Sequence, residues 1–200
     1  AGKTTSIRMM LGLVQPSGGR ITVCGKPVSD PNSRAGVGYA SETSTLYPQL
    51  TIGEYLNLLT AIYGKPPLSG KVEESLALFD LKAIDKIGRL SKGNRQKVSL
   101  LLATVFEPQL LILDEPTSGL DPVARLQVLE LIRRERERGS TIILSSHVLP
   151  EVERVADSVA IMHKGKLMTI VRNKAGAYGK DNEAPIALEK VFMQAIGGVS

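Results

Sequence analysis

The sequence predicts an α/β fold in which helices surround a mainly parallel sheet. Two apolar runs, "QLLILDEP" (109–116) and "STIILSSH" (140–147), show no alternation of polar and apolar residues, as expected for strands covered on both faces. Segments with helical periodicity alternate with the expected strands, which favours parallel strands joined by helical crossovers. With 200 residues, 42% hydrophobic and 4% aromatic, the chain suits one domain with an aliphatic core.

The first half of the chain alternates short strands with helices. Apolar residues recur at helical spacing between Ile7 and Val14, and "RITVCG" and "GVGYAS" have the composition of short strands. A helix is expected over "TIGEYLNLLTAIYG" (51–64). Thr51 is its N-cap, Glu54 completes a capping box, and Gly64 ends it.

The second half continues the pattern. Helices are expected over 69–81, over "LSKGNRQKVSLLLATVFEP" (90–108) and over 121–139, with Pro122 in the first turn and Gly139 as the C-terminal cap. A short helix (148–156), a hairpin that turns at Lys164-Gly165 and a last helix (185–198) follow. The polar, glycine-rich stretch 172–184 is expected to be a mobile linker.

Composition leaves the partner class open. The net charge of +5 suits nucleic acid or an anionic membrane surface, but it also suits many other proteins. No run reaches the roughly 18 apolar residues of a membrane span, so a membrane role is expected to come through a partner. The one cysteine, Cys24, cannot form an internal disulfide and indicates a reducing compartment; we expect it to be a small buried residue.

The opening "AGKTT" matches the end of the phosphate-binding pattern G-x-x-x-x-G-K-[ST]. Gly2 allows close backbone approach, Lys3 reaches the β- and γ-phosphates, and the Thr4 hydroxyl suits Mg²⁺. Five residues alone are equally compatible with an ordinary polar helix N-terminus.

Acidic residues follow the strand "LLILDEP". Asp114 can orient Mg²⁺ and Glu115 can accept a proton from an attacking water, at the sheet edge where α/β proteins bind ligands. An acidic surface pair is the alternative. His147 ends the next apolar strand, where a neutral imidazole can bond to a γ-phosphate, whereas His163 is interpreted as structural.

The order of these motifs resembles the nucleotide-binding domain of ABC transporters. "AGKTT" resembles the end of Walker A, "LSKGN" the signature motif, "LLILDEP" Walker B, "SGLD" the D-loop and "SSH" the switch histidine. The resemblance runs from residue 1 to about 170. It implies a P-loop ABC-type ATPase domain over 1–171, with a helical signature subdomain at about 51–106, and a linker with a C-terminal helix over 172–200.

The resemblance implies a head-to-tail pair of such domains with ATP and Mg²⁺ between them. The residues expected to contact ATP in their own subunit are Ala1, Gly2, Lys3, Thr4 and Thr5. The residues expected to contact the ATP of the partner subunit are Ser91, Lys92, Gly93 and Asn94. Ser118, Gly119, Leu120 and Asp121 would lie at the dimer seam. Catalysis is expected from Glu115, His147 and Glu42, and Mg²⁺ binding from Thr4, Asp114 and Glu42.

Two departures from the family pattern stand out. Glu42 replaces the usual Q-loop glutamine, and "VGYASETSTLYPQLT" resembles an exporter subgroup that shares this acid. In the signature motif, Lys92 and Asn94 replace the usual Gly and Gln. Lys92 opposes the helix dipole but adds positive charge near phosphate.

The function expected from this resemblance is ATP hydrolysis that powers a membrane transporter, most simply an exporter. A permease would dock near the Q-loop and the helices at about 51–79, which places the chain on the cytoplasmic face of the membrane. The alternatives are an ABC-type ATPase that acts on nucleic acid, the less favoured partner, and a nucleotide switch with little turnover. We also expect that the chain is cut within its own P-loop, without its N-terminal strands, and as given binds ATP poorly.

Overall fold

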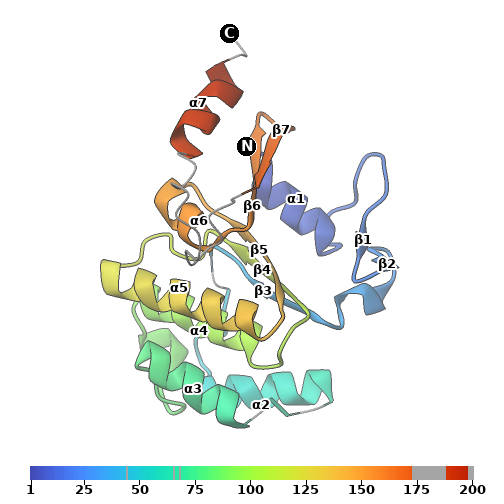
Figure 1. Ribbon diagram of the computed structural model, residues 1–200. Coiled ribbons are helices and arrows are strands. Elements are labelled where there is room, and N and C mark those ends of the chain that lie inside the picture. The colour runs from blue at the N-terminus through green and yellow to red at the C-terminus, as the bar shows by residue number, and fades with distance from the viewer. Residues whose placement is uncertain (44, 65, 68, 173–187, 198–200) are drawn as a thin grey trace. The chain divides into compact units, whose positions relative to one another are not determined.

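The computed structural model describes residues 1–200 except 44, 65, 68, 173–187 and 198–200 (Figure 1). The chain divides into two compact units. One consists of Ala1–Ile21 together with Ser145–Ser200, and the other is Thr22–Leu144. The linker expected over 172–184 lies outside the described residues except for Arg172, which ends a strand.

The described elements alternate as the sequence predicts. The α-helices are α1 (Lys3–Met10), α2 (Ile52–Tyr63), α3 (Ser69–Phe79), α4 (Lys92–Thr104), α5 (Pro122–Glu137), α6 (Leu149–Val155) and α7 (Leu188–Gly197). The strands are β1 (Thr22–Val23), β2 (Lys26–Pro27), β3 (Val37–Ala40), β4 (Leu110–Asp114), β5 (Thr141–Ser145), β6 (Ser158–His163) and β7 (Lys166–Arg172). Two short 3₁₀ helices are η1 (Pro31–Arg34) and η2 (Ile87–Arg89).

The sheet of the Thr22–Leu144 unit has the order β3-β4-β5. β3 and β4 are parallel, with Val37 opposite Leu110 and Ala40 opposite Leu113, so their carboxyl ends meet at one edge. α4 packs closely on β3, since a Cβ atom at Gly38 would lie 2.1 Å from the carbonyl oxygen of Ala103. A glycine is therefore required where the helix crosses the strand.

The core of this unit is aliphatic and centred on β4, as the composition predicts. Leu111, Ile112 and Leu113 are fully buried, and α4 and α5 both add buried aliphatic side chains. The buried residues of these two helices include Val98, Leu100, Leu101, Val128, Leu131 and Ile132.

The prediction that β5 is buried on both faces is wrong. Thr141 is exposed and Ile142, Ile143 and Leu144 are only partly buried, although the run is as apolar as β4. The reason is position: within the described residues, β5 lies at the end of its sheet and pairs only with β4. Apolar composition therefore does not by itself give a central strand.

Helix ends follow the predicted capping chemistry. The Thr51 hydroxyl accepts from the Glu54 N–H, and the Glu54 carboxylate accepts from the Thr51 N–H at 2.7 Å, which confirms the capping box. Gly64 ends α2 in the left-handed conformation. Pro122 occupies the first turn of α5, with Asp121 as its N-cap.

The unit formed by Ala1–Ile21 and Ser145–Ser200 holds α1, α6, α7 and the β6–β7 hairpin. The hairpin is antiparallel and turns at Lys164-Gly165, as predicted. α1 ends at Met10 rather than reaching Val14, which is 41% exposed. α7 contacts α6, β6 and β7, and the Leu188 N–H donates to Glu153 Oε1 at 2.7 Å.

The expectation that Cys24 is buried is also wrong. Val23 pairs with Lys26, so Cys24 and Gly25 form the two-residue turn between β1 and β2. Both have positive φ, 49° and 75°, as the tightest hairpin turns require. The turn presents the thiol to solvent.

Candidate functional site

The start of α1 has no capping side chain. Gly2 adopts a left-handed conformation (φ 96°) as the N-cap, without a capping side chain, and the first turn has no acidic residue. The first N–H groups of a helix have no partners within the helix, and together with its dipole they favour an anion. Thr4 lies in this first turn and is partly buried, whereas Thr5 is exposed.

Lys3 and the segment around His147 lie together in the same unit. Lys3 Nζ donates to the carbonyl oxygen of Ser146 at 3.1 Å, and the Val148 N–H donates to Ser146 Oγ at 3.0 Å. His147 is exposed. The lysine therefore contacts the backbone immediately before the expected switch histidine.

Ala1 and Gly2 fit closely against the β6–β7 turn. The Gly165 N–H donates to the Ala1 carbonyl at 3.1 Å, and a Cβ at Gly2 would lie 3.2 Å from Gly165 Cα. Gly2 is thus restricted to glycine both by its positive φ and by its neighbour.

The acidic pair lies at the end of β4 in the other unit. Asp114 is 2% exposed and Glu115 is 9% exposed. Glu115 has a left-handed backbone (φ 49°), which is uncommon outside glycine and recurs where function holds a side chain in place. The Ser118 N–H donates to the Glu115 carbonyl at 3.1 Å and closes the turn after the strand.

Glu42 lies near this pair because β3 and β4 end at the same edge. Ser118 Oγ donates to Glu42 Oε1 at 3.4 Å, which joins the expected Q-loop position to the D-loop. Gln96 of α4, 5% exposed, donates through Nε2 to the Ser41 carbonyl at 3.3 Å. Sequence reasoning missed Gln96; its one signal is an amide on the buried face of an apolar helix.

The signature residues begin α4. Ser91 is the N-cap, and its hydroxyl oxygen accepts from the Asn94 N–H at 3.1 Å. A Cβ at Gly93 would lie 3.4 Å from a methyl group of Leu120, and one at Gly119 would lie 3.7 Å from Lys92 Nζ. The signature motif and the D-loop are therefore neighbours within this unit.

Asp121, expected at the dimer seam, is also the N-cap of α5. Its carboxylate accepts from the Ala124 N–H at 2.9 Å and caps α5. That hydrogen bond, together with the Val123 N–H and the charge of Lys97, outweighs the desolvation that acts against it, and the pKa of Asp121 lies below its ordinary value. Leu120, by contrast, is buried.

The candidate side chains form two groups. Lys3, Thr4 and His147 belong to one unit, while Glu42, Asp114, Glu115 and the signature residues belong to the other. Among the described residues, no three His, Cys, Asp or Glu side chains gather as a metal site. A hydroxyl with one or two carboxylates still suits Mg²⁺, which keeps several waters or phosphate oxygens as ligands.

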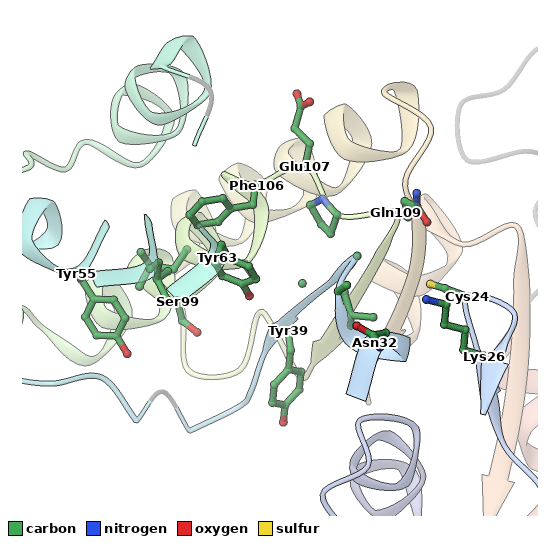
Figure 2. Close-up of a pocket in the computed structure, with 18 of the residues that line it drawn as sticks. Cys24, Lys26, Asn32, Tyr39, Tyr55, Tyr63, Ser99, Phe106, Glu107 and Gln109 are labelled. Carbon is green, nitrogen blue, oxygen red and sulfur yellow. The ribbon is translucent and has the colours of Figure 1, made fainter. Parts of the chain in front are cut away.

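A cavity of about 570 Å³ lies within the Thr22–Leu144 unit (Figure 2). Three tyrosines, Tyr39, Tyr55 and Tyr63, line it together with Phe106. The Tyr63 and Phe106 rings are 4.6 Å apart, and Tyr47 stacks on Tyr55 at 5.8 Å. Burial raises the pKa of Tyr55, aided by Tyr47. The β1–β2 hairpin borders the cavity on its other side.

A helix that begins Gly-Lys-Thr and a buried parallel strand that ends in two acids define a P-loop-type nucleotide-binding α/β protein. The family model described as ABC transporter matches residues 1–118. The chain therefore belongs to the ABC transporter ATP-binding family, which confirms the resemblance seen in the sequence.

Similar proteins and solved structures agree with this family assignment. An uncharacterized ABC transporter ATP-binding protein of Synechocystis sp. is 35% identical over 98% of this chain and 57% of its own length. A Nod factor export ATP-binding protein I of Burkholderia orbicola is 36% identical over 83% of this chain and 57% of its own. A solved ATP-binding subunit of an ABC transporter superposes with a TM-score of 0.77 at 35% identity, covering 86% of this chain and 74% of that one.

A second solved structure supports the fold alone. It is a dimeric ATP-binding cassette bound to ADP and Pi in a post-hydrolysis state, with a TM-score of 0.75 at 22% identity over 86% of this chain and 80% of its own. The chain spans little more than half the length of the curated relatives named above. Every helix among the described residues is too short or too polar to cross a membrane.

Proposed function

We propose that this chain is the ATP-binding and ATP-hydrolysing part of an ABC exporter. The observation that carries the proposal is the buried Asp114–Glu115 pair at the end of β4, in a chain that belongs to the family. The name of the Nod factor export relatives supports the export direction.

Glu115 is proposed to accept the proton of the attacking water. Its left-handed backbone and the turn closed by Ser118 hold the carboxylate at the end of a rigid strand, and burial favours a role in proton transfer. Lys3 would leave the Ser146 carbonyl to bind phosphate oxygens, and His147 would bond to the terminal phosphate.

Thr4, Asp114 and Glu42 are proposed to hold Mg²⁺. Their hydroxyl and carboxylate oxygens are the ligands that a hard divalent cation prefers. When bound, the ion neutralises phosphate charge. Glu42 would keep its place through the Ser118 hydroxyl, so its carboxylate would face the same sheet edge as Asp114.

Two chains are proposed to act head to tail. Ser91, Lys92, Gly93 and Asn94 would then present the start of α4 to the ATP of the partner subunit, where unpaired N–H groups favour phosphate. The Ser91 hydroxyl accepts within its own helix but can still donate to a phosphate oxygen. Residues 118–121 adjoin the signature motif and would lie at the seam.

The aromatic cavity is proposed as the docking site for a transmembrane permease on the cytoplasmic side. Tyr39 comes directly before the 40–42 segment, and Gln96 ties that segment to α4. A partner helix anchored in the cavity would therefore contact Tyr39, which the 40–42 segment connects to Glu42 and, through Gln96, to the signature helix α4. Tyr55→Ala should weaken permease binding in a pull-down while ATP binding is unchanged.

Phosphate release by the purified full-length protein tests the main proposal. Glu115→Gln should lower hydrolysis by about 100-fold or more, because the amide cannot accept the proton, and should leave ATP binding intact. Glu137→Gln, an exposed acid on α5, is the matched control and should keep the wild-type rate. Unchanged turnover in Glu115→Gln would overturn the assignment.

Two measurements on the wild-type protein decide between the alternatives. ATP binding without phosphate release by the wild-type protein would favour a nucleotide switch. Salt-dependent binding of nucleic acid at physiological ionic strength would favour the nucleic-acid alternative.

A further inference from the structure

α3 and α5 are joined by ion pairs that run in both directions. Lys71 of α3 contacts Glu135 of α5, with Nζ 2.7 Å from Oε1. Three residues further along α3, Glu74 pairs with Arg134 (2.8 Å to Oε1) and with Arg138. Because α3 supplies both a cation and an anion to residues of α5 and its C-terminal cap, the contact fixes register as well as distance. We call these five residues the α3–α5 clamp.

The inner pair of the clamp is buried. The Lys71 and Glu135 side chains are 3% and 1% exposed. Arg138 donates a second bond to Glu135 Oε1 at 2.8 Å, while Oε2 has no hydrogen-bond partner within the described part of the chain. Charged side chains are almost never buried so fully unless they are paired.

Stability alone does not account for such a pair. The cost of removing two charges from water often cancels their attraction, so an apolar pair of similar size is commonly as stable. A buried ion pair is more demanding about geometry, because its attraction and its hydrogen bonds are lost over a small displacement. Lys71 and Glu135 therefore specify orientation more than they add stability.

The outer part of the clamp, in which Glu74 pairs with Arg134 and Arg138, is charged at neutral pH. Burial acts to raise the pKa of Glu74, but hydrogen bonds from Arg138 and Arg134 outweigh it, and the pKa lies below its ordinary value. The outer part of the clamp thus keeps its charges over the physiological range.

The helix oriented by the clamp is α4. It contacts both α3 and α5, and Lys97 of α4 donates to the Phe79 carbonyl at the end of α3 at 3.5 Å. At its own N-terminus, α4 meets Leu120 through Gly93. The clamp and this contact lie near opposite ends of α5.

Because the clamp lies far along α5 from the Gly93–Leu120 contact, a small rotation at that contact would displace the clamp residues by a large distance. Asp121 and Glu135 are fourteen residues apart along one helix, or about 21 Å at 1.5 Å per residue. A rotation of about 10° around the Gly93–Leu120 contact would move the clamp by about 4 Å at that radius, enough to separate every pair. The ion pairs therefore resist rotation of α3 and α4 against α5.

We propose that Lys71 and Glu135 are positioning residues for ATP hydrolysis: they set the direction in which α4 presents the signature motif relative to Glu115. The effect on turnover rests on the proposed ATPase function. The orientation itself does not, so the two are tested separately.

The test is a double-mutant cycle with Lys71→Met, Glu135→Leu and the double variant. Glu135→Leu leaves the buried Lys71 without its carboxylate, and Lys71→Met leaves the buried Glu135 with Arg138 alone. Each single variant should therefore lower Tm by about 5–10 °C, while the apolar double variant should return close to the wild-type Tm. Turnover should nevertheless stay at least about fivefold low in the double variant, with KM for ATP unchanged. The single variant Lys71→Arg, which keeps the positive charge, should hydrolyse ATP at close to the wild-type rate.

Arg133→Met with Glu137→Leu is the matched control. This half-exposed pair joins two residues of α5 and lies outside the five residues of the clamp, so its loss should leave turnover and KM unchanged. Wild-type hydrolysis by the double variant Lys71→Met with Glu135→Leu would overturn the proposal, because the pair would then serve packing alone.

A distance measurement separates this proposal from the ATPase assignment. With Cys24→Ser, spin labels at exposed residues 73 and 123 report the angle between α3 and α5. The double variant should broaden the distance distribution although its Tm has recovered; an unchanged distribution would overturn the clamp. Wild-type protein that binds ATP without hydrolysing it would overturn the ATPase assignment and leave the distance result to decide.

Discussion

β4 and β5 are almost interchangeable as sequences, yet they differ as parts of the fold. Both are apolar runs of similar length that lead into polar residues. Leu111, Ile112 and Leu113 of β4 are fully buried, whereas Ile142 and Ile143 of β5 keep part of their surface in solvent. The difference lies in their neighbours: β4 is flanked by two strands of the described sheet and β5 by one.

The comparison also separates the chemical groups that follow each strand. Asp114 ends the strand with the more complete cover, Glu115 follows it, and both are themselves buried. His147 comes after the partly exposed strand and is itself exposed. A proton acceptor benefits from a fixed, desolvated position, while a side chain that senses phosphate benefits from freedom to move. The two strands therefore suit the two roles proposed for the residues after them.

The largest effect is expected from Ile112→Ala in β4. Removing a fully buried side chain loses its transfer free energy and leaves a cavity, so the free energy of unfolding should fall by about 3–4 kcal/mol. Urea denaturation followed by circular dichroism measures the change. A loss below about 1 kcal/mol would show that the cover of β4 is loose, and the contrast with β5 would disappear.

Gly38→Ala should give the next largest loss of stability, because it disturbs the packing of α4 on β3, the strand beside β4. The new Cβ would lie 2.1 Å from the Ala103 carbonyl oxygen, so β3 or α4 must shift. Overpacking of this kind costs about 2–3 kcal/mol. Gly36→Ala is the control: its Cβ would lie 3.5 Å from a side-chain atom of Gln109, an ordinary contact. Equal stability of the two variants would refute the close crossing.

Sequence reasoning found the elements and motifs but not their surroundings. The Thr51–Glu54 capping box and the Lys164-Gly165 turn depend on neighbours a few residues away, so their prediction was confirmed. The burial of β5 and the exposure of Cys24 depend on strand order and turn register, which local composition does not encode.

The candidate site shows the same limit. The acidic pair after β4 was predicted because a buried strand and its polar end are contiguous in sequence. The link between Gln96 and Ser41 and the clamp between Lys71 and Glu135 join residues 55 and 64 positions apart. Nothing in the spacing of an isolated helix reveals which partner its buried polar group will meet.

Ile143→Ala sharpens the comparison from the β5 side. The side chain is only partly buried, so less surface returns to water and the cavity opens to solvent; a loss of about 1–2 kcal/mol is expected. The measurement is the same urea titration used for Ile112→Ala. A loss as large as that of Ile112→Ala would mean that β5 is covered in solution by something other than the described residues.

The smallest effect concerns pH and extends the contrast between buried and solvent-shared groups to α5. Hydrogen bonds from Arg133 and Arg134 lower the pKa of Glu130 from its ordinary 4.5 to about 2. A carboxyl whose pKa is lower in the folded state adds stability above its unfolded pKa and loses it as the pH falls through the folded pKa. The loss should therefore occur between about pH 4.5 and pH 2. Because the Glu130 side chain is 32% exposed, solvent screening limits its share to about 0.5 kcal/mol. Urea titrations at about pH 7, 4.5 and 3 should show a slightly shallower decline for Glu130→Gln than for the wild-type chain; parallel declines would mean that water, rather than the arginines, sets the free energy of this carboxylate.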